Sequence, residues 1–403
     1  MKSNTENEVE KMEMRWLRAS DYDELLDMLN ATFANKYGEE VDFLTLQPKM
    51  WVRDDEHMGR HLGIFEDGKL VSVAGIYPLP TVVMGERLNF MTTGNVATLP
   101  GYEGRGYFTK IFTELMERLR ELGADAARLG GARQRYARFG YEQCGTTYRV
   151  EYTAINRTKC FGNGDTGIEF KRVLPTDKAS LEFIRGLVSK KPFHVIRGGG
   201  DIDEQYRALT TKHSLPYIAE RQGEPIGYIS AALGGVNVGA EEWGEIIGEV
   251  GVINEGVRVD MINAWQKKVG KDISFTLAPH EVEALSAFGN TAELITVGAP
   301  SHFKFLNYER TANALMKLKA SYTDMPKGEA VLGIREYGNL RFYNTGCECG
   351  CTLTDKTASF TVDKLTASRL IFGYMPPEAF LGVPRELSAF LPLPLSWNTL
   401  DYT

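Results

Sequence analysis

The sequence predicts a mixed α/β (α+β) protein with two related units followed by a smaller α+β unit. Its 403 residues are too many for one ordinary core and suit two or three domains. Two segments recur in type at nearly the same spacing, which indicates a duplication. LRASDYDELLDML near Asp21 returns as VLPTDKASLEFIRGLV near Asp177, and LGIFEDGKLVSVAGIY near Gly68 returns as YIAERQGEPIGYISAAL near Gly223. We therefore expect units at 1–157, 158–302 and 303–403.

The first unit contains two predicted amphipathic helices and a hairpin between them. Apolar residues repeat at helical spacing after Asp21 and again after the glycine-rich stretch near residue 104. The first stripe comprises Tyr22, Leu25, Leu26, Leu29 and Phe33, and the second comprises Ile111, Phe112, Leu115, Met116, Leu119 and Leu122. Gly123 suits the end of the second helix, and the Asp67-Gly68 pair suits a tight turn between two strands.

The pattern changes again from about residue 305, where a helix, short alternating strands and a Pro-rich end follow one another. The end of the chain is too apolar for a solvated linker. Its large apolar residues are Phe390, Leu391, Leu393, Leu395, Trp397 and Leu400. We expect this tail to be packed inside the protein.

Composition is typical of a globular protein in the cytoplasm. The net charge of −7 argues against a nucleic-acid partner, which usually requires a basic surface. We find no apolar run long enough to cross a bilayer, and the acidic N-terminus lacks the apolar stretch of a secretory signal. We therefore expect a cytoplasmic protein that binds neither nucleic acid nor membrane.

Five cysteines are few for this length, but Cys347, Cys349 and Cys351 form a C-x-C-x-C run. On a strand, alternation would place all three on one face. A closed zinc site needs four ligands, and its pairs usually stand two to four residues apart. Packing or incidental thiols therefore explain the run better than a metal, and we predict no metal site.

A glycine-dense loop, LPGYEGRGYF, links a predicted strand to the second helix. Gly101, Gly104 and Gly106 allow successive N–H groups to converge on one anion, and the helix adds its positive N-terminal end. A pyrophosphate suits this loop. The spacing matches neither the dinucleotide-binding G-x-G-x-x-G fingerprint with its ribose-binding acid nor the GK[ST] of a P-loop.

Tyr136 follows this loop by about thirty residues, within GARQRYARFGYE. A phenol with a pKa near 10 is a suitable acid for a thiolate that leaves with a pKa near 8.5. The alternative is that Tyr136 is a packed aromatic beside Phe139 and Tyr141. Loop and tyrosine together favour transfer of an acyl group from coenzyme A.

Residues 95–141 resemble the core of the GNAT superfamily of acetyltransferases. VATLPGYEGRGYF corresponds to its fourth strand and pyrophosphate loop, and YARFGY corresponds to its tyrosine and the following aromatic turn. With a second unit that lacks the loop and a small C-terminal unit, the whole chain resembles the enhanced intracellular survival (Eis) acetyltransferases. These have two GNAT-like units followed by a domain similar to sterol carrier proteins.

The resemblance implies acetyl-CoA as cosubstrate and a set of site residues. Tyr136 would be the general acid, and the carboxylate of Thr403 would be the general base. The implied cosubstrate-binding residues are Val96, Ala97, Thr98, Gly104, Arg105, Gly106, Tyr107, Phe108 and Thr109. Two positions depart from the superfamily pattern: Glu103 stands where Arg or Gln is usual, and Phe108 stands where a small residue is usual. We expect Glu103 to face solvent or to pair with Arg105.

The sequence thus predicts an N-acetyltransferase that works by direct transfer in a ternary complex. The resemblance implies an aminoglycoside, a polyamine or a lysine side chain as acceptor, and a homo-oligomer of the hexameric kind. Asp401 near the end of the chain would favour a polycation. Asp54, Asp55 and Glu56 either do the same or form a solvated charge run. The alternative function is a non-catalytic acyl-CoA-binding or lipid-binding protein that uses its C-terminal domain.

Overall fold

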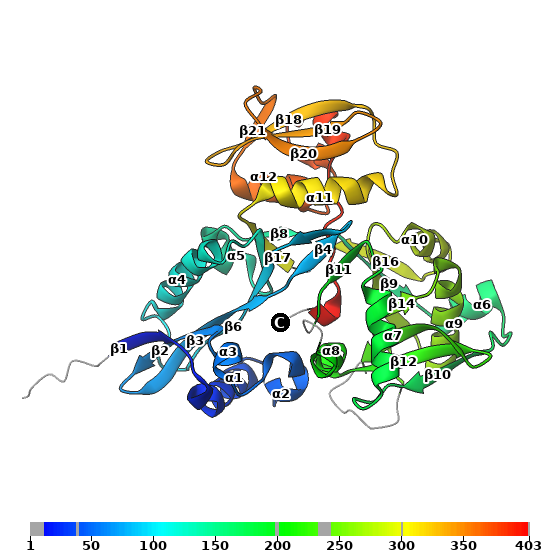
Figure 1. Ribbon diagram of the computed structural model, residues 1–403, viewed down its shortest axis with the longest axis horizontal. Helices are drawn as coiled ribbons and strands as arrows, with labels where there is room; N and C mark the ends of the chain where they lie inside the picture. The colour runs from blue at the N-terminus through cyan, green and yellow to red at the C-terminus, as the bar shows by residue number, and fades with distance from the viewer. Residues whose placement is uncertain (1–11, 38–39, 198–200, 233–242, 300, 402–403) are drawn as a thin grey trace, which may run out of the picture.

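The computed structural model describes residues 12–37, 40–197, 201–232, 243–299 and 301–401. Within these residues the chain forms two seven-stranded sheets, a three-stranded sheet and a four-stranded sheet. In Figure 1 the first unit (blue to cyan) and the second unit (green) lie side by side, and the third (yellow to orange) sits above both. This arrangement confirms the predicted mixed α/β class.

The first sheet has the strand order β1-β2-β3-β6-β7-β17-β8. Its strands are β1 (Met12–Trp16), β2 (His61–Glu66), β3 (Lys69–Pro78), β6 (Phe90–Thr98), β7 (Ala126–Leu129), β17 (Ser301–Phe305) and β8 (Glu142–Cys144). β6 and β7 run parallel, and their pairing ends at Thr93 and Leu129. Because β6 continues to Thr98, the two strands part beyond Thr93.

Helices cover both faces of the first sheet, as the apolar stripes predict. α1 (Tyr22–Tyr37) packs on one face and α4 (Tyr107–Glu121) on the other. The short helices of this unit are α2 (Phe43–Leu46), α3 (Asp55–Met58) and α5 (Arg133–Tyr136). The α4 stripe is buried except for Leu122, which follows the helix and is 37% exposed, so the prediction is wrong for that residue.

The second sheet repeats the first strand by strand, in the order β10-β12-β13-β14-β15-β9-β16. Its strands are β10 (Ile168–Arg172), β12 (Ser214–Arg221), β13 (Glu224–Ala232), β14 (Ile246–Val252), β15 (Ile273–Leu277), β9 (Thr147–Tyr152) and β16 (Leu294–Gly298). Its helices are α6 (Ala154–Phe161), α7 (Lys178–Val188), α8 (Ile202–Leu209), α9 (Arg258–Val269) and α10 (Val282–Gly289). The hairpin turns Asp67-Gly68 and Gln222-Gly223 both have two positive φ angles, which supports the duplication.

The two sheets exchange one strand each. β9 follows β8 of the first unit but pairs with β15 and β16 in the second sheet. β17 follows β16 of the second unit but lies between β7 and β8 in the first sheet. Each sheet is therefore completed by a strand from the other half of the sequence, and the boundaries expected at 157 and 302 do not separate the sheets.

A small sheet also joins the units: β11 (Phe193–Val195) pairs with β4 (Thr81–Val83), which pairs with β5 (Glu86–Leu88). The third unit has a sheet of order β20-β19-β18-β21. Its elements are α11 (Tyr308–Ala320), β18 (Gly328–Ile334), β19 (Gly338–Asn344), β20 (Cys349–Thr354), β21 (Phe360–Val362), α12 (Lys364–Phe372) and α13 (Arg385–Ser388).

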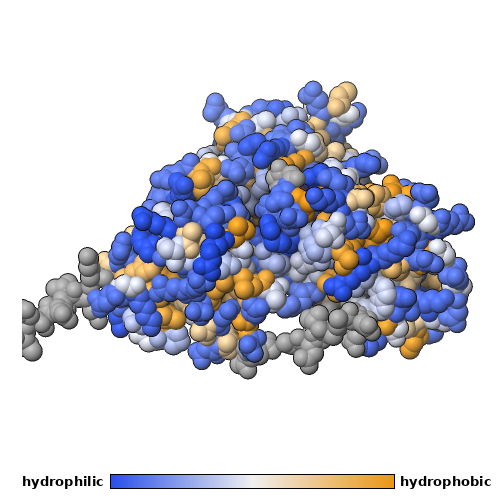
Figure 2. Space-filling view, turned by 60° about the horizontal axis from the view of Figure 1, so that its bottom comes forward, coloured by the Kyte–Doolittle hydropathy of each residue, from blue (hydrophilic) through white to orange (hydrophobic). Residues whose placement is uncertain are grey.

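The tail returns from the third unit to the space between the other two, where the short 3-10 helix η8 (Thr399–Asp401, red in Figure 1) lies near α8. All six large apolar residues predicted to be packed there are at most 6% exposed, which confirms the prediction. The face in Figure 2 is mostly hydrophilic, with hydrophobic residues in small separate patches. Among the described residues, no helix has the length and apolar character needed to traverse a bilayer.

Candidate functional site

β6 carries a β-bulge on the edge that faces β3. Two residues of β6, Asn95 and Val96, stand opposite the single residue Ala74 of β3. Asn95 has a positive φ of 53°. A bulge takes one residue out of the hydrogen-bonded ladder and re-aims its neighbours. Along β6, the bulge lies just beyond Thr93, the residue at which β6 and β7 part.

The loop after β6 is built on left-handed glycines. Gly101, Gly104 and Gly106 have φ values of 89°, 79° and 80°. Nothing lies within 4 Å of a Cβ placed on any of them, so backbone conformation rather than crowding favours glycine. Gly106 is the N-cap of α4. Because the first-turn amides of a helix have no partner within it, this loop and helix have the features that the predicted anion site requires.

The loop forms one wall of a cleft of about 1330 Å³, a volume that includes open solvent. Strand, loop and helix all contribute to its lining. Seven of the nine predicted cosubstrate-binding residues line it: Val96, Ala97, Thr98, Gly104, Gly106, Tyr107 and Phe108. The structure therefore brings most of the predicted set together in one place.

The other two predicted residues, Arg105 and Thr109, are engaged outside the cleft lining that the described residues form. An Arg105 Nη1 donates to Glu66 Oε2 at 2.8 Å. Arg138 donates to Thr109 Oγ1 at 2.9 Å. Because both side chains are engaged elsewhere, any contact with the cosubstrate would be made by the backbone N–H groups of these residues. That role stays a prediction.

Glu103 lines the cleft but turns back on its own loop. Its Oε2 accepts a hydrogen bond from the Gly101 N–H at 2.7 Å. Glu103 is exposed, which agrees with the expectation that it faces solvent, and Arg105 pairs with Glu66. One loop amide is thus occupied by a carboxylate at the place where a pyrophosphate would bind.

Tyr136 ends α5 and is 4% exposed. Its ring packs against Phe108 and Phe112, with ring centroids 5.8 Å and 5.3 Å away. Burial raises the pKa of Tyr136, and Arg135 opposes this shift. The phenol therefore keeps its proton at neutral pH, as a general acid must. Tyr136 does not line the cleft among the described residues, whereas Phe108 and Arg135 on either side of it do.

The exchanged strand β17 supports the turn after Tyr136. Lys304 of β17 donates from Nζ to the Phe139 carbonyl oxygen at 2.8 Å. Gly140 follows with a φ of 87°, and a Cβ there would lie 2.8 Å from the Lys304 nitrogen. The positive φ of Gly140 therefore favours glycine in this turn, whereas the Lys304 amine is the end of a flexible side chain and can shift.

Thr403, the predicted base, lies outside the described residues. Asp401, two residues earlier, is buried and lines a pocket together with residues of the first two units. Arg197 binds both of its carboxylate oxygens, with Nε–Oδ1 and Nη2–Oδ2 distances of 2.7 Å and 3.0 Å. Lys49 of the first unit donates to the Leu400 carbonyl oxygen at 2.7 Å. The tail is therefore fixed to both units.

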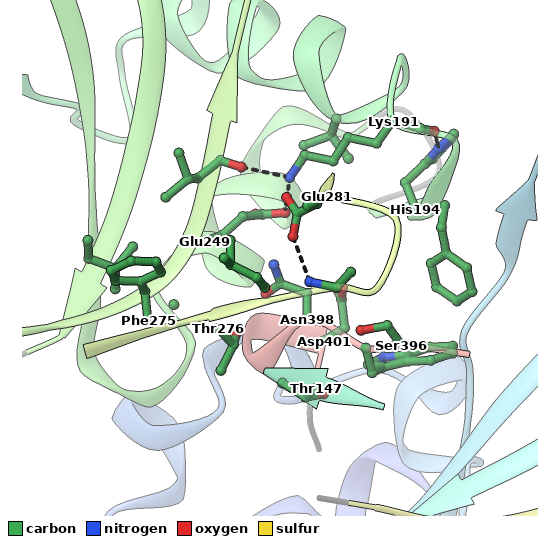
Figure 3. A pocket seen from close by; sticks show the side chains of 18 of the residues that line it. Thr147, Lys191, His194, Glu249, Phe275, Thr276, Glu281, Ser396, Asn398 and Asp401 are labelled. Atoms are coloured by element: carbon green, nitrogen blue, oxygen red, sulfur yellow. Dashed lines mark hydrogen bonds and ion pairs between the residues drawn. The ribbon is translucent and has the colours of Figure 1, made fainter. Parts of the chain in front are cut away.

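In the second unit, the tail fills the opening between the two strands that correspond to β6 and β7. β14 pairs with β15 only at Ile246 and Ile247. At the next residue, the Thr399 hydroxyl donates to the Gly248 carbonyl oxygen at 3.0 Å. A pocket remains beside the tail. Figure 3 shows it, with Ser396, Asn398 and Asp401 of the tail on one side and Glu249 and Lys191 on the other.

The start of α9 in the second unit carries ion pairs instead of a glycine loop. Arg258 pairs with Glu255 at 2.6 Å and with Glu281 at 3.0 Å. Glu255 belongs to η6 (Glu255–Val257), the short turn that leads into α9. Carboxylates therefore lie at the start of α9, where their negative charge would repel a phosphate. This supports the prediction that the second unit has no phosphate site.

Sequence reasoning missed a buried hydrogen-bond chain behind the bulge. Asn95 donates from Nδ2 to the Tyr77 hydroxyl at 2.6 Å, and that hydroxyl lies 2.8 Å from His61 Nε2. His61 Nδ1 lies 3.2 Å from the Met58 carbonyl oxygen. Burial lowers the pKa of His61 to about 4, so the ring is neutral, donates from Nδ1 and accepts from Tyr77. His61 and Asn95 lie on strands that are far apart in the sequence, so no local pattern indicates that they share this chain.

The acidic run at Asp54 has structural partners. Asp54 caps α3 by accepting from the His57 N–H, Asp55 accepts from the Ala19 N–H, and Glu56 pairs with Arg60. These contacts favour the solvated charge run over a substrate site.

In the cysteine run, Cys349 and Cys351 share one face of β20, whereas Cys347 precedes the strand and is exposed. Among the described residues, no three side chains of the metal-binding types stand close enough together to hold an ion.

Residues 13–144, which contain the bulge, the loop and Tyr136, match the family model described as an acetyltransferase (GNAT) domain. The chain is thus similar to GNAT acetyltransferases over this segment. The match confirms the predicted enzyme class, an N-acetyltransferase, and the acyl-CoA type of cosubstrate. No curated protein matches the chain by sequence.

Three solved structures share the fold over nearly the whole chain. A probable N-acyltransferase from Enterococcus faecalis has a TM-score of 0.67 and 15% identity, covering 98% of this chain and 100% of its own. A GCN5-related N-acetyltransferase from Kribbella flavida gives 0.66 and 18%, with the same coverage. Eis1 from Mycobacterium abscessus gives 0.61 and 15%, covering 96% and 99%. The fold of nearly the whole chain is thus shared with these proteins, while the sterol-carrier likeness of the third unit stays a prediction.

Proposed function

We propose that the chain transfers the acetyl group of acetyl-CoA to an amine by direct attack within a ternary complex. One observation carries the proposal. The bulged end of β6, the glycine loop and the first turn of α4 line a single cleft beside Tyr136. The cleft suits the pantetheine arm along β6 and the pyrophosphate at the loop.

Each reacting group has a proposed residue. The amine nitrogen attacks the thioester carbonyl carbon while a β6 backbone N–H near Thr98 polarises the carbonyl oxygen. The carbon–sulfur bond then breaks, and Tyr136 gives its proton to the sulfur. The Thr403 carboxylate takes the proton of the amine. The buried position of Asp401 between the units supports a tail that reaches the acceptor.

The acceptor class stays part of the proposal: an aminoglycoside, a polyamine or a lysine side chain. We also propose that the unit built on the first sheet is catalytic, that the unit built on the second sheet is a degenerate copy, that the third unit is a sterol-carrier-like domain, and that the chain assembles into a homo-oligomer. The internal repeat and the ion pairs at the start of α9 support the degenerate character of the second unit.

The test is Tyr136→Phe, which removes only the phenolic hydroxyl. Because a positioned general acid contributes about 10²–10⁴ in rate, we expect kcat to fall at least a hundredfold. The dissociation constant for coenzyme A, measured by calorimetry, is expected to stay within about twofold, since the packed ring remains. Coenzyme A release would be followed with spermidine, an aminoglycoside and a lysine peptide.

Tyr343→Phe in β19 of the third unit is the matched control and is expected to keep the kcat of the parent protein. An unchanged kcat in Tyr136→Phe would remove Tyr136 from the mechanism. Absence of transfer from the parent protein to every amine would refute the proposed function itself.

A further inference from the structure

The bulge of β6 is a piece of backbone that regular strand pairing does not fix. Asn95 and Val96 together oppose the single residue Ala74, where the register with β3 shifts. The pairing of β6 with β7 has already ended at Thr93. Val96 nevertheless lines the cosubstrate cleft, so the direction of its backbone N–H and C=O groups matters for a ligand there. A contact outside the strand ladder is therefore needed to hold this backbone in place.

The side chain of Asn95 supplies that contact. Asn95 has a left-handed φ of 53°, a conformation in which asparagine is enriched among the residues other than glycine. The residue is only 6% exposed, and its Nδ2 donates to the Tyr77 hydroxyl at 2.6 Å. Because a buried donor without an acceptor is costly, this bond ties the bulged residue to β3.

The structure makes room for the Tyr77 hydroxyl at Gly75. A Cβ on Gly75 would lie 2.2 Å from the hydroxyl oxygen of Tyr77 and 2.5 Å from its Cζ. The φ of Gly75 is outside the left-handed region, so space rather than backbone conformation accounts for this glycine. Gly75 pairs with His61 of β2 on one side and with Gly94 of β6 on the other. The tyrosine ring therefore lies over Gly75, with its hydroxyl between His61 and the bulge.

The hydrogen bonds that start at Asn95 run in one direction. The Met58 carbonyl oxygen only accepts, so His61 donates to it from Nδ1 at 3.2 Å. The neutral ring then accepts at Nε2 from the Tyr77 hydroxyl at 2.8 Å. Because the hydroxyl proton is used in this bond, the Tyr77 oxygen accepts from Asn95. The position of Asn95 is thus set, through two side chains, by the backbone at Met58.

Packing encloses these side chains. His61 and Tyr77 are 0% and 3% exposed, and the Trp51 ring stacks on His61 with ring centroids 5.8 Å apart. Trp51 itself donates from Nε1 to the Phe43 carbonyl oxygen at 2.7 Å. His61, Tyr77 and Asn95 do not line the cosubstrate cleft that the described residues form. Their effect on a thioester would therefore pass through the backbone of the bulge.

We propose that Asn95, Tyr77 and His61 are positioning residues that hold the bulge of β6 against the pantetheine arm and the thioester of acetyl-CoA. This inference rests on the proposed function and adds three residues to it. They act through the backbone N–H and C=O groups beside the cleft. The competing explanation is that their hydrogen bonds only stabilise the first sheet.

Tyr77→Phe tests the proposal because it removes only the hydroxyl at the centre of the three residues. Two ligands separate the parts of the cosubstrate: coenzyme A, and 3′-phospho-ADP, which has the pyrophosphate but no pantetheine. We expect the dissociation constant of coenzyme A, measured by calorimetry, to rise about tenfold, and that of 3′-phospho-ADP to stay within about twofold. We expect kcat to fall about tenfold or more, since the thioester is misplaced.

Tyr152→Phe is the matched control. Tyr152 of the second sheet is 0% exposed, and its hydroxyl donates to Asn263 Oδ1 at 2.6 Å. We expect a similar loss of stability in urea unfolding, with both dissociation constants unchanged. If Tyr77→Phe is destabilised like this control and keeps the parent's ratio of the two dissociation constants, the proposal is overturned.

Asn95→Gly is the milder second variant, because glycine keeps the left-handed conformation and the bond between Tyr77 and His61 remains. We expect the same selective loss of affinity for coenzyme A. The double variant Asn95→Gly/Tyr77→Phe is expected to lose no more than the weaker-binding single variant, since both changes break one bond. Additive losses would overturn the shared role. Absence of coenzyme A binding and of acetyl transfer in the parent protein would instead overturn the proposed function.

Discussion

Glu103 is the residue at which the cosubstrate cleft departs most from a simple anion site. Its carboxylate accepts from the Gly101 N–H and lines the cleft in which a pyrophosphate is expected. Two effects follow. The Gly101 N–H is not available to bind the pyrophosphate, and the negative charge of Glu103 lies close to the place where the pyrophosphate is expected. The turn itself does not require the charge, because a neutral amide oxygen accepts the same hydrogen bond.

Glu103→Gln is therefore expected to strengthen binding of coenzyme A. At about 4 Å in water, removal of one like-charge contact is worth about 1 kcal/mol, or a roughly fivefold lower dissociation constant. Calorimetric titration at low and high salt measures this, and the gain is expected to shrink with salt because the site is exposed. Glu114→Gln, farther along α4, is the control. Weaker binding by Glu103→Gln would mean that the carboxylate orders the loop more than it repels the ligand.

At the scale of elements, the tail is held by buried charges. Arg197 lies between Asp401 and Glu249, and all three side chains are at most 7% exposed. Burial alone would raise the pKa of Glu249, but Arg197 and Lys191 outweigh it and lower the pKa to about 2. Removing one partner of such a cluster leaves an uncompensated charge, which costs far more than the pair contributes.

Glu249→Gln is expected to destabilise the protein by about 3 kcal/mol at pH 7. A carboxylate with a depressed folded-state pKa stabilises above its unfolded value, near 4.3, and loses this contribution as pH falls toward 2. The difference between parent and variant should therefore shrink between pH 4.5 and pH 2, because the parent becomes protonated there. Urea unfolding across this range measures it. A difference independent of pH would show that Glu249 acts through packing rather than charge.

The elements of the site were predictable from sequence because their signals are local. Left-handed glycines, the apolar stripe of α4 and the apolar tail each act within a few residues, and the structure has all three. Contacts between distant residues carry no such signal. Lys49 contacts Leu400 across 351 residues and Arg197 contacts Asp401 across 204, so no local pattern predicts that they line one pocket. Asp401 was expected to favour a polycation, whereas in the structure it pairs with Arg197.

At the scale of the whole molecule, the exchange of β9 and β17 was equally hidden. Both strands have ordinary alternating sequences, and no local sequence pattern indicates which sheet each strand joins. The internal repeat predicted two self-contained units, whereas each sheet borrows a strand that the repeat assigns to the other. The exchange also affects the proposed active site, because Lys304 of β17 donates a hydrogen bond to the turn after Tyr136.

The two large units should therefore fold only together. A fragment of residues 1–157 lacks β17, so β7 and β8 lose the strand between them, and its own β9 has no sheet to join. We expect this fragment to be unfolded or aggregated, and the full chain to lose both sheets in one urea transition followed by fluorescence and circular dichroism. Coexpression of 1–157 with 158–403 is expected to restore a folded complex with coenzyme A binding, because it supplies β17 in trans. An isolated fragment that unfolds cooperatively at the midpoint of the full chain would contradict this, since it would show that the first sheet closes without its borrowed strand.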